Sequence, residues 1–321
     1  MARRKGCAIR EPANALVSVV IPSYRSASIV GDAIESLLAQ TRLPDEIIVV
    51  DDGSPPTDNT AAVCNRFGEA VQYIRQDNGG ASAARNTGID AASGDWLAFL
   101  DADDVWDHEK LELQLAQLAA HPEADFSVTA SLVWSPQNQS YEIYRWDGPP
   151  DPNVMRAELL VRNIFTGSCS SLLVKRDVLE TAGCFAAGKA SEDRRLLLKL
   201  LERHQAVILD APLIRQRPGP AHWTNPERHR LEMLSLIEDH AELFRRLDHT
   251  GCLRRRALAN THDRAGMHYL QNGNLMAASR DLMQAAVLWP LLPNPWRVLV
   301  NACLGRLKLP RKQRTHKAGA A

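Results

Sequence analysis

The residues best suited to chemistry are three carboxylates, Asp101, Asp103 and Asp104, which directly follow an apolar run at residues 96–100. That run predicts a buried strand. Residues two apart in an extended chain project to the same side, so Asp101 and Asp103 can converge on one point. Paired carboxylates suit Mg²⁺ or Mn²⁺, ions that usually share their ligands with substrate phosphates. A solvated acidic turn is the alternative interpretation of the same residues.

The first hundred residues alternate between strand-like and helix-like patterns. Strands are expected at residues 17–21, 46–50, 71–74 and 96–100, with apolar positions at helical spacing between them and Pro22 stopping the first strand. Apolar strands separated by helices are typical of a parallel sheet covered on both faces. The sequence therefore predicts an α/β fold with a Rossmann-like, mostly parallel sheet, which binds ligands at the carboxyl ends of its strands.

Polar residues gather at these strand ends. Ser23 and Tyr24 follow the first strand, Asp51 and Asp52 follow the second, and the aspartates at 101 and 103 follow the last. Tyr24 could instead be a core aromatic residue, and the pair at 51–52 could be a plain turn. The chain has neither G-x-G-x-x-G after the first strand nor a P-loop pattern, which argues against a dinucleotide-dependent dehydrogenase and a P-loop enzyme.

The bulk composition is that of an ordinary globular protein. Of 321 residues, 45% are hydrophobic and 24% are charged, and 38 basic residues balance 38 acidic ones to a net charge of +0. This balance argues against a general nucleic-acid binder. The six cysteines are scattered without a C-x-x-C pair, which favours free thiols in a cytoplasmic protein. No apolar stretch approaches the ~18 residues of a membrane span.

Five segments, taken in order, resemble the family 2 inverting glycosyltransferases, which have the A-type nucleotide-sugar-binding (GT-A) fold. The set lies within residues 16–220. The matching segments contain Pro22-Ser23-Tyr24, Asp51-Asp52-Gly53-Ser54, Asn78-Gly79-Gly80 with Arg85-Asn86, Asp101-Ala102-Asp103, and Ser191-Glu192-Asp193 before a leucine-rich helix.

The resemblance implies a nucleotide site at the strand ends. There, Tyr24 stacks on the nucleobase and one of Asp51 and Asp52 accepts a ring N–H, while Arg85 approaches the nucleotide or its phosphates. Mn²⁺ or Mg²⁺ is expected on Asp103 and Asp101. His222 is expected to be a third metal ligand or a contact to the diphosphate, or else simply an exposed loop residue. The full set of expected nucleotide-binding residues is Pro22, Ser23, Tyr24, Asp51, Asp52, Asn78, Gly79, Arg85, Asp101 and Ala102.

The resemblance also implies that Asp193 is the catalytic base. In an inverting transfer, a carboxylate accepts the proton of the attacking hydroxyl, and a metal ion neutralises the leaving diphosphate. Glu192 is expected to position the acceptor, above a strand predicted at residues 167–174. Acidic residues are also common at helix N-termini, which is the alternative explanation of this pair.

The expected organisation is a disordered lead (residues 1–15), a catalytic domain (16–225), a helical extension (226–309) and a basic disordered tail (310–321). The catalytic domain divides into a nucleotide-binding half (16–104) and an acceptor half (105–225), and the extension contains a tetratricopeptide-like helix pair. No acidic residue follows Asp281, whereas seven Lys or Arg residues do. The resulting basic amphipathic C-terminal segment either lies on an anionic membrane or packs on the core.

Together these features predict metal-dependent, inverting transfer of one sugar from a nucleotide-diphosphate sugar, a UDP-sugar above all. The expected acceptor is a hydroxyl of a glycan or lipid-linked molecule, as in cell-surface polysaccharide or lipopolysaccharide synthesis. The chain shows no Q-x-x-R-W motif, which favours a non-processive enzyme. The expected location is cytoplasmic, with peripheral contact at the inner membrane face. A nucleotidyltransferase on the same sheet and a non-catalytic helical scaffold are the rival functions.

Overall fold

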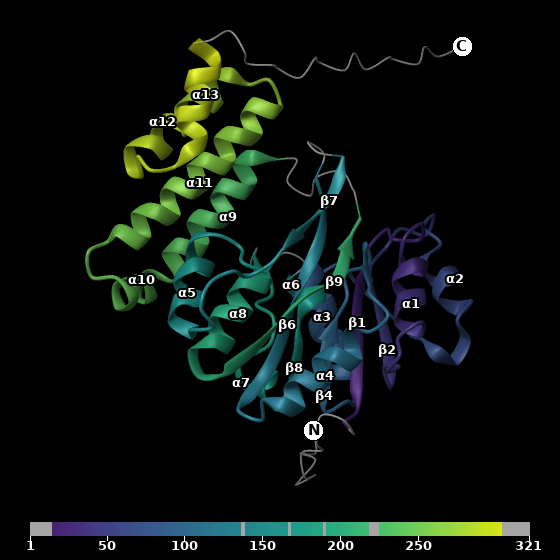
Figure 1. The fold of residues 1–321 in the computed structure, drawn as a ribbon. Coiled ribbons are helices and arrows are strands. Elements are labelled where there is room, and N and C mark those ends of the chain that lie inside the picture. Colours follow the sequence, from purple (N-terminus) through teal and green to yellow (C-terminus); the bar gives the residue numbers. More distant parts are fainter. Residues whose placement is uncertain (1–14, 136–138, 166–167, 189–190, 218–224, 304–321) are drawn as a thin grey trace, which may run out of the picture. The chain divides into compact units, whose positions relative to one another are not determined.

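The computed structural model describes residues 15–135, 139–165, 168–188, 191–217 and 225–303 (Figure 1). Contacts between residues divide the chain into two units. The first contains residues 1–159 and 163–219, and the second contains residues 160–162 and 220–321. The expected lead, apart from Ala15, lies outside the described residues, and so does the expected basic tail. The predicted ligand His222 also lies outside them.

The first unit is built on one mixed sheet, which has nine strands in the part of the chain described. The strand order is β3-β2-β1-β4-β8-β6-β9-β5, with β7 paired to β6. The strands β3, β2, β1 and β4 are parallel, as predicted for the N-terminal half. Their bounds are β1 (Val17–Ser23), β2 (Glu46–Asp52), β3 (Gln72–Gln76), β4 (Trp96–Phe99), β5 (Asp104–Trp106), β6 (Ala124–Ser135), β7 (Ser140–Tyr144), β8 (Leu173–Lys175) and β9 (Gln205–Gln216).

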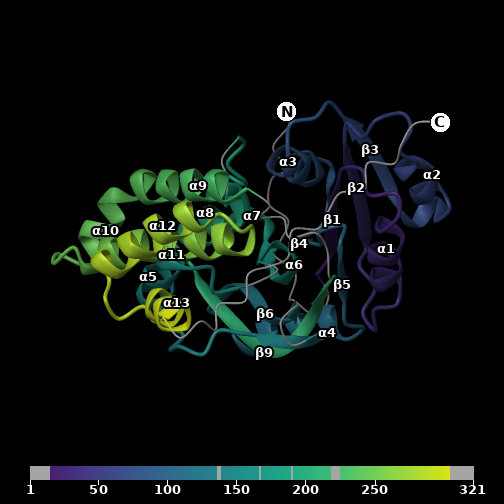
Figure 2. The same ribbon diagram turned by 90° about the horizontal axis from the view of Figure 1, so that it is seen from above.

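Helices cover both faces of the parallel strands, because the strands are apolar on both sides. Val17 and Val19 of β1 join a buried cluster with Leu37 and Leu115, whereas Val20 points to the opposite face. Figure 2 shows α1 and α3 on opposite sides of this part of the sheet. The helices of the unit are α1 (Val30–Leu38), α2 (Thr60–Asn65), α3 (Ala81–Ala91), α4 (Lys110–Ala120), α5 (Pro152–Val161, which ends in the second unit), α6 (Ser168–Ser171), α7 (Arg176–Thr181) and α8 (Glu192–Arg203).

The prediction that Pro22 stops the first strand is wrong, because β1 continues to Ser23 and Pro22 pairs with Val50 of β2. The carbonyl of Val20 accepts a hydrogen bond from the Leu100 N–H on the β4 side. Pro22 lies two residues further along, so its missing N–H would also face β4, which has already ended at Phe99. The proline therefore removes no hydrogen bond from the sheet.

Gly88 sets how closely α3 approaches β1. A Cβ at Gly88 would lie 2.3 Å from Cγ1 of Val20. We expect Gly88→Ala to lower the free energy of unfolding by about 1–3 kcal/mol, the usual cost of overpacking, in urea melts. The matched control is Gly31→Ala in α1, where the nearest atom to a new Cβ is Val63 Cγ1 at an ordinary 3.6 Å. Equal stability of the two variants would contradict this packing.

The second unit is helical, as predicted from Pro226 onward. A Cβ at Gly266 would lie 2.7 Å from Cγ of Leu282, so α11 and α12 pack in close contact. No helix among the described residues is long and apolar enough to cross a membrane. The helices of this unit are α9 (Pro226–Asp239), α10 (Ala241–Leu247), α11 (Cys252–Gln271), α12 (Leu275–Leu288) and α13 (Pro293–Cys303).

Candidate active site

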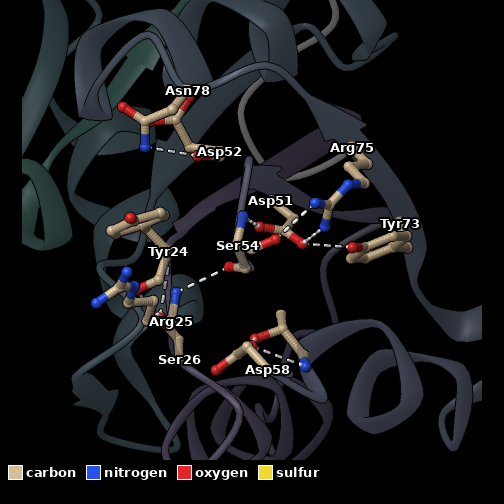
Figure 3. Close-up of polar contacts among 11 residues, drawn as sticks. Tyr24, Arg25, Ser26, Asp51, Asp52, Ser54, Asp58, Tyr73, Arg75 and Asn78 are labelled. Atoms are coloured by element: carbon tan, nitrogen blue, oxygen red, sulfur yellow. Dashed lines mark hydrogen bonds and ion pairs between the residues drawn. The ribbon is translucent and has the colours of Figure 1, made fainter. Parts of the chain in front are cut away.

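Asp51, at the end of β2, is held by three hydrogen-bond donors (Figure 3). Its Oδ1 accepts from the Ser54 N–H at 2.9 Å, and its Oδ2 accepts from the Tyr73 hydroxyl at 2.6 Å and Arg75 Nη1 at 2.9 Å. Burial raises the pKa of the Asp51 carboxyl, but these hydrogen bonds and the Arg75 charge outweigh burial and leave the pKa below its ordinary value. Asp51 is therefore an ionised acceptor in a fixed orientation.

Asp52 shapes the turn that leads into α3. Its Oδ1 accepts from the Gly79 N–H at 2.8 Å, its Oδ2 accepts from the Gly80 N–H at 2.7 Å, and its backbone carbonyl accepts from Asn78 Nδ2 at 2.7 Å. Gly80 has φ +87°, a conformation that favours glycine. The structure thus brings the Asp51-Asp52 pair and the Asn78-Gly79 segment together, as the motifs suggested.

Tyr24 lies just beyond β1 and is 46% exposed, so it is not a core residue. The Arg25 guanidinium lies 5.3 Å from the centre of its ring, and the Arg25 N–H donates to Ser54 Oγ at 2.8 Å. Figure 3 shows Tyr24, Asp51 and Asn78 around the ends of β1 and β2. The neighbouring Ser23 hydroxyl is buried and has no hydrogen-bond partner among the described residues. This corner therefore offers an exposed ring beside fixed polar groups.

Arg85 connects two of the predicted motifs. It is 4% exposed; its Nη2 donates to Asp101 Oδ1 at 2.6 Å and its Nη1 donates to Glu192 Oε1 at 2.9 Å. Burial lowers the pKa of the Arg85 guanidinium, but the two carboxylates raise it above its ordinary value. The Arg85 guanidinium also lies 5.2 Å from the centre of the Phe185 ring. The Asn86 side chain donates to the Phe185 carbonyl and accepts from the Phe185 N–H, which holds Phe185 in place. The motifs around Asp101 and Glu192 are thereby joined through one cation.

The D-x-D segment has an alternating pattern of burial. Asp101 and Asp103 are partly exposed, whereas Ala102 and Asp104 are buried. Ser170 holds the segment through two hydrogen bonds: its Oγ donates to Asp104 Oδ2 at 2.6 Å and accepts from the Asp101 N–H at 3.0 Å. Asp101 and Asp103 are therefore the more accessible carboxylates of the segment, and carboxylate oxygens fit the preference of Mg²⁺ or Mn²⁺.

Sequence reasoning missed the role of Ser170, and its prediction of a strand at residues 167–174 is wrong over 168–171. Those residues form the short helix α6, and the strand β8 begins only at Leu173. The helical turn lets Ser170 contact Asp101 and Asp104, and it also places the Ser170 carbonyl 3.0 Å from Trp106 Nε1. A run of small polar residues gives no local signal for these long-range contacts.

Asp193 lies in the first turn of α8. Its Oδ1 accepts from the Arg194 N–H at 2.7 Å and its Oδ2 accepts from Asn163 Nδ2 at 3.4 Å. The side chain is partly exposed. Because Glu192 precedes it and binds Arg85, the predicted base and the D-x-D segment belong to one connected cluster.

A second acidic group lies just before α4, and no sequence motif singled it out. The group consists of Asp107, His108 and Glu109, whose potential ligand atoms lie within 4.8 Å of one another. No other group of this kind is found among the described residues. All three side chains are exposed, and their proximity follows from their being consecutive in the chain. Acidic groups of this kind are common without a metal ion.

Comparison with known proteins identifies a family to which the chain belongs. The family model for glycosyl transferase family 2 matches residues 18–183, more than half of the chain. An uncharacterized glycosyltransferase of Rickettsia typhi is 30% identical over 224 residues, which are 68% of this chain and 68% of that protein. A Bacillus subtilis protein named for teichuronic acid biosynthesis is 31% identical over 172 residues, covering 50% of this chain and 63% of that protein. An uncharacterized glycosyltransferase of Rickettsia bellii is 39% identical over 100 residues. These residues are 31% of this chain but only 14% of the length of that protein.

Solved structures share the fold at low sequence identity. A Pyrobaculum calidifontis mannosyltransferase in complex with GDP-Man and Mn²⁺ matches with TM-score 0.60 and 19% identity over 92% of this chain and 82% of that chain. The Staphylococcus aureus protein TarS (residues 1–349) in complex with UDP-GlcNAc matches with TM-score 0.56 and 16% identity over 85% of this chain and 91% of that chain. These similarities confirm the predicted α/β, GT-A type fold with a helical C-terminal region.

Proposed function

Because this chain belongs to glycosyl transferase family 2, we propose that it moves one sugar from a nucleotide-diphosphate sugar to a hydroxyl acceptor, with inversion at the anomeric carbon. The observation that carries the proposal is Arg85, which ties Asp101 of the D-x-D segment to Glu192 beside Asp193. An inverting transfer needs groups for the leaving diphosphate and for the incoming hydroxyl within one site. The Arg85 bridge supplies that proximity.

The nucleotide is proposed to bind between Tyr24 and the ends of β1 and β2. The exposed Tyr24 ring can stack on the base, and the ionised Asp51 can accept a ring N–H. Asp52 holds the Asn78–Gly80 turn beside it. A UDP-sugar is the proposed donor substrate, with the ring N–H of uracil donating to Asp51.

The Asp101 and Asp103 carboxylates are proposed to hold Mn²⁺ or Mg²⁺. A divalent cation bound there would neutralise the negative charge of the leaving diphosphate. Arg85 pairs with Asp101, so a cation held by this pair would share the Asp101 carboxylate with the Arg85 guanidinium. His222 as a further ligand stays a proposal from the sequence.

Asp193 is proposed to accept the proton of the attacking hydroxyl. As the acceptor oxygen bonds to the anomeric carbon, the bond from that carbon to the diphosphate breaks and its electron pair leaves with the diphosphate. The hydrogen bonds from Arg194 N–H and Asn163 hold the Asp193 carboxylate in place. Glu192, fixed by Arg85, is proposed to position the acceptor.

Neither of the rival functions explains this arrangement as well. A nucleotidyltransferase would use the same strand ends, but it has no need of an acidic pair at the start of α8. A scaffold would not need the Arg85 bridge or the ionised Asp51. One sugar per encounter is proposed, on a glycan or lipid-linked acceptor at the inner membrane face. The B. subtilis relative is named for teichuronic acid biosynthesis, which supports a role in polysaccharide synthesis.

A panel of nucleotide-sugars and nucleoside triphosphates, each with Mn²⁺ or with EDTA, tests the proposal by thermal denaturation. A ligand that binds only the folded state raises Tm by mass action. We expect one class of nucleotide-sugar to raise Tm with Mn²⁺ and much less with EDTA. Stabilisation by triphosphates alone would point to nucleotidyl transfer, and stabilisation by no nucleotide would favour the scaffold.

A further inference from the structure

Arg85 is a buried cation that contacts carboxylates from two distant segments of the chain. It belongs to α3 and is 4% exposed. Its Nη2 donates to Asp101 Oδ1 at 2.6 Å and its Nη1 donates to Glu192 Oε1 at 2.9 Å, while its buried Nε has no hydrogen-bond partner among the described residues. The Phe185 ring lies 5.2 Å from the guanidinium and packs edge-on against Phe99, with 5.0 Å between the ring centres. The guanidinium is therefore held by two carboxylates and covered by an apolar ring.

The thiol of Cys169 lies in the same cluster but supplies no negative charge. Cys169 is 4% exposed, and burial raises the pKa of its thiol well above the ordinary value. Arg85 lowers this pKa, whereas the nearby carboxylates, Asp101 among them, raise it further. The thiol therefore stays protonated, and the charge of Arg85 is balanced by carboxylates.

The Asp101 carboxylate is shared between Arg85 and any cation that the D-x-D segment holds. A divalent cation and a guanidinium on one carboxylate repel each other, and this repulsion is stronger in a buried site than in water. Glu192 binds the other nitrogen of the same guanidinium, so its negative charge offsets part of the positive charge that an arriving cation would meet. Without the Glu192 charge, Arg85 would interact with Asp101 alone and would oppose the cation more strongly.

We propose that Glu192 raises the affinity of the D-x-D segment for Mn²⁺ or Mg²⁺ by acting through Arg85. Glu192 is a positioning residue in this role, because it takes up part of the guanidinium charge and leaves Asp101 more available to the cation. Linkage makes the effect reciprocal, so a cation on Asp101 strengthens the pair between Arg85 and Glu192. Cation binding on the donor side thereby also fixes the start of α8, where the proposed base Asp193 follows Glu192. The inference rests on the proposed function for the metal site itself.

Titration of the full chain with Mn²⁺ alone tests this role without any turnover measurement, because the EPR signal of the free ion reports the amount bound. In Glu192→Gln, the side chain keeps its size and an oxygen that can accept from Arg85 Nη1, so only the charge is lost. We expect its dissociation constant for Mn²⁺ to rise by at least about fivefold, the lower end of typical coupling between linked sites. The matched control is Glu202→Gln at the other end of α8, where Glu202 pairs with Arg156 at 3.6 Å. This control loses the same charge from the same helix and should bind Mn²⁺ as the wild type does.

A double-mutant cycle with Arg85→Lys separates an effect through Arg85 from a direct effect of Glu192 on the ion. Lysine keeps the positive charge but lacks the planar fork that binds two carboxylates at once. We expect Glu192→Gln to change the Mn²⁺ affinity less in the Arg85→Lys background than in the wild type. An effect of the same size in both backgrounds would overturn the proposal. If Arg85→Lys does not fold, the comparison of Glu192→Gln with Glu202→Gln decides alone.

Asp103→Ala distinguishes failure of this inference from failure of the proposed metal site. If the wild type binds Mn²⁺ and Asp103→Ala does not, the metal site stands, and wild-type Mn²⁺ affinity in Glu192→Gln would overturn only the role of Glu192. If the wild type binds no Mn²⁺, or Asp103→Ala binds it as tightly as the wild type, the metal site and the inference are both wrong.

Discussion

Asp193→Asn is expected to lower turnover by at least about 10²-fold, the usual contribution of a positioned general base, while donor-substrate affinity stays almost unchanged. Asparagine keeps the shape of the side chain and an oxygen that can accept from the Arg194 N–H, so α8 should still start at the same residue. The lost property is the ability to take up a proton. Turnover and the dissociation constant of the nucleotide-sugar are measured separately.

Asp177→Asn is the matched control for this variant. Asp177 also lies in the first turn of a helix, α7, and its Oδ1 accepts from the N–H of the next residue at 2.9 Å, as Asp193 does at 2.7 Å. If helix stabilisation were the whole role of Asp193, the two substitutions would have similar effects. Wild-type turnover in Asp193→Asn, or a loss confined to donor-substrate affinity, would contradict its assignment as the base.

Asp103→Ala is expected to abolish turnover and most of the Mn²⁺-dependent affinity for the nucleotide-sugar. Asp103 and Asp101 are the partly exposed carboxylates of the D-x-D segment, and a cation held by one carboxylate binds far more weakly than one held by two. The Tm without ligands should change little because the side chain is partly exposed. Isothermal titration with the nucleotide-sugar, with and without Mn²⁺, measures the affinity.

Asp107→Ala is the control, because Asp107 belongs to the exposed acidic group just before α4. We expect this variant to keep both turnover and the Mn²⁺ dependence. The opposite outcome, in which Asp107→Ala loses metal dependence and Asp103→Ala retains it, would move the metal site to α4. If the wild type bound the nucleotide-sugar equally well with Mn²⁺ and with EDTA, the proposed metal dependence would be wrong.

The parallel half of the sheet was predictable because its buried strands are continuous apolar runs. Val17–Ser23 and Glu46–Asp52 carry that signal, and the polar residues at their ends meet because parallel strands end at the same edge. Pro22 misled the prediction, since a proline interrupts a sheet only where its N–H is needed. That need depends on where β4 ends, which no local pattern of β1 reveals.

The contacts that complete the candidate site were not predictable from local sequence. Arg85 and Glu192 are 107 residues apart, and each was assigned a separate role by its own motif. Ser170 contacts Asp101 and Asp104 only because residues 168–171 turn into α6. Such contacts follow from tertiary packing, which selects among local conformations that the sequence leaves nearly equal in energy.

The most direct test of the account is the anomeric configuration of the sugar that the enzyme releases. Glycosyltransferases can transfer their sugar slowly to water, so no acceptor needs to be known. Proton NMR of a Mn²⁺ reaction with an α-linked nucleotide-sugar, followed before the released sugar mutarotates, distinguishes the two stereochemical outcomes. For an inverting enzyme with Asp193 as its base, the β-anomer forms first and Asp193→Asn greatly slows its formation. Initial release of the α-anomer, or no cleavage of any nucleotide-sugar, would contradict it.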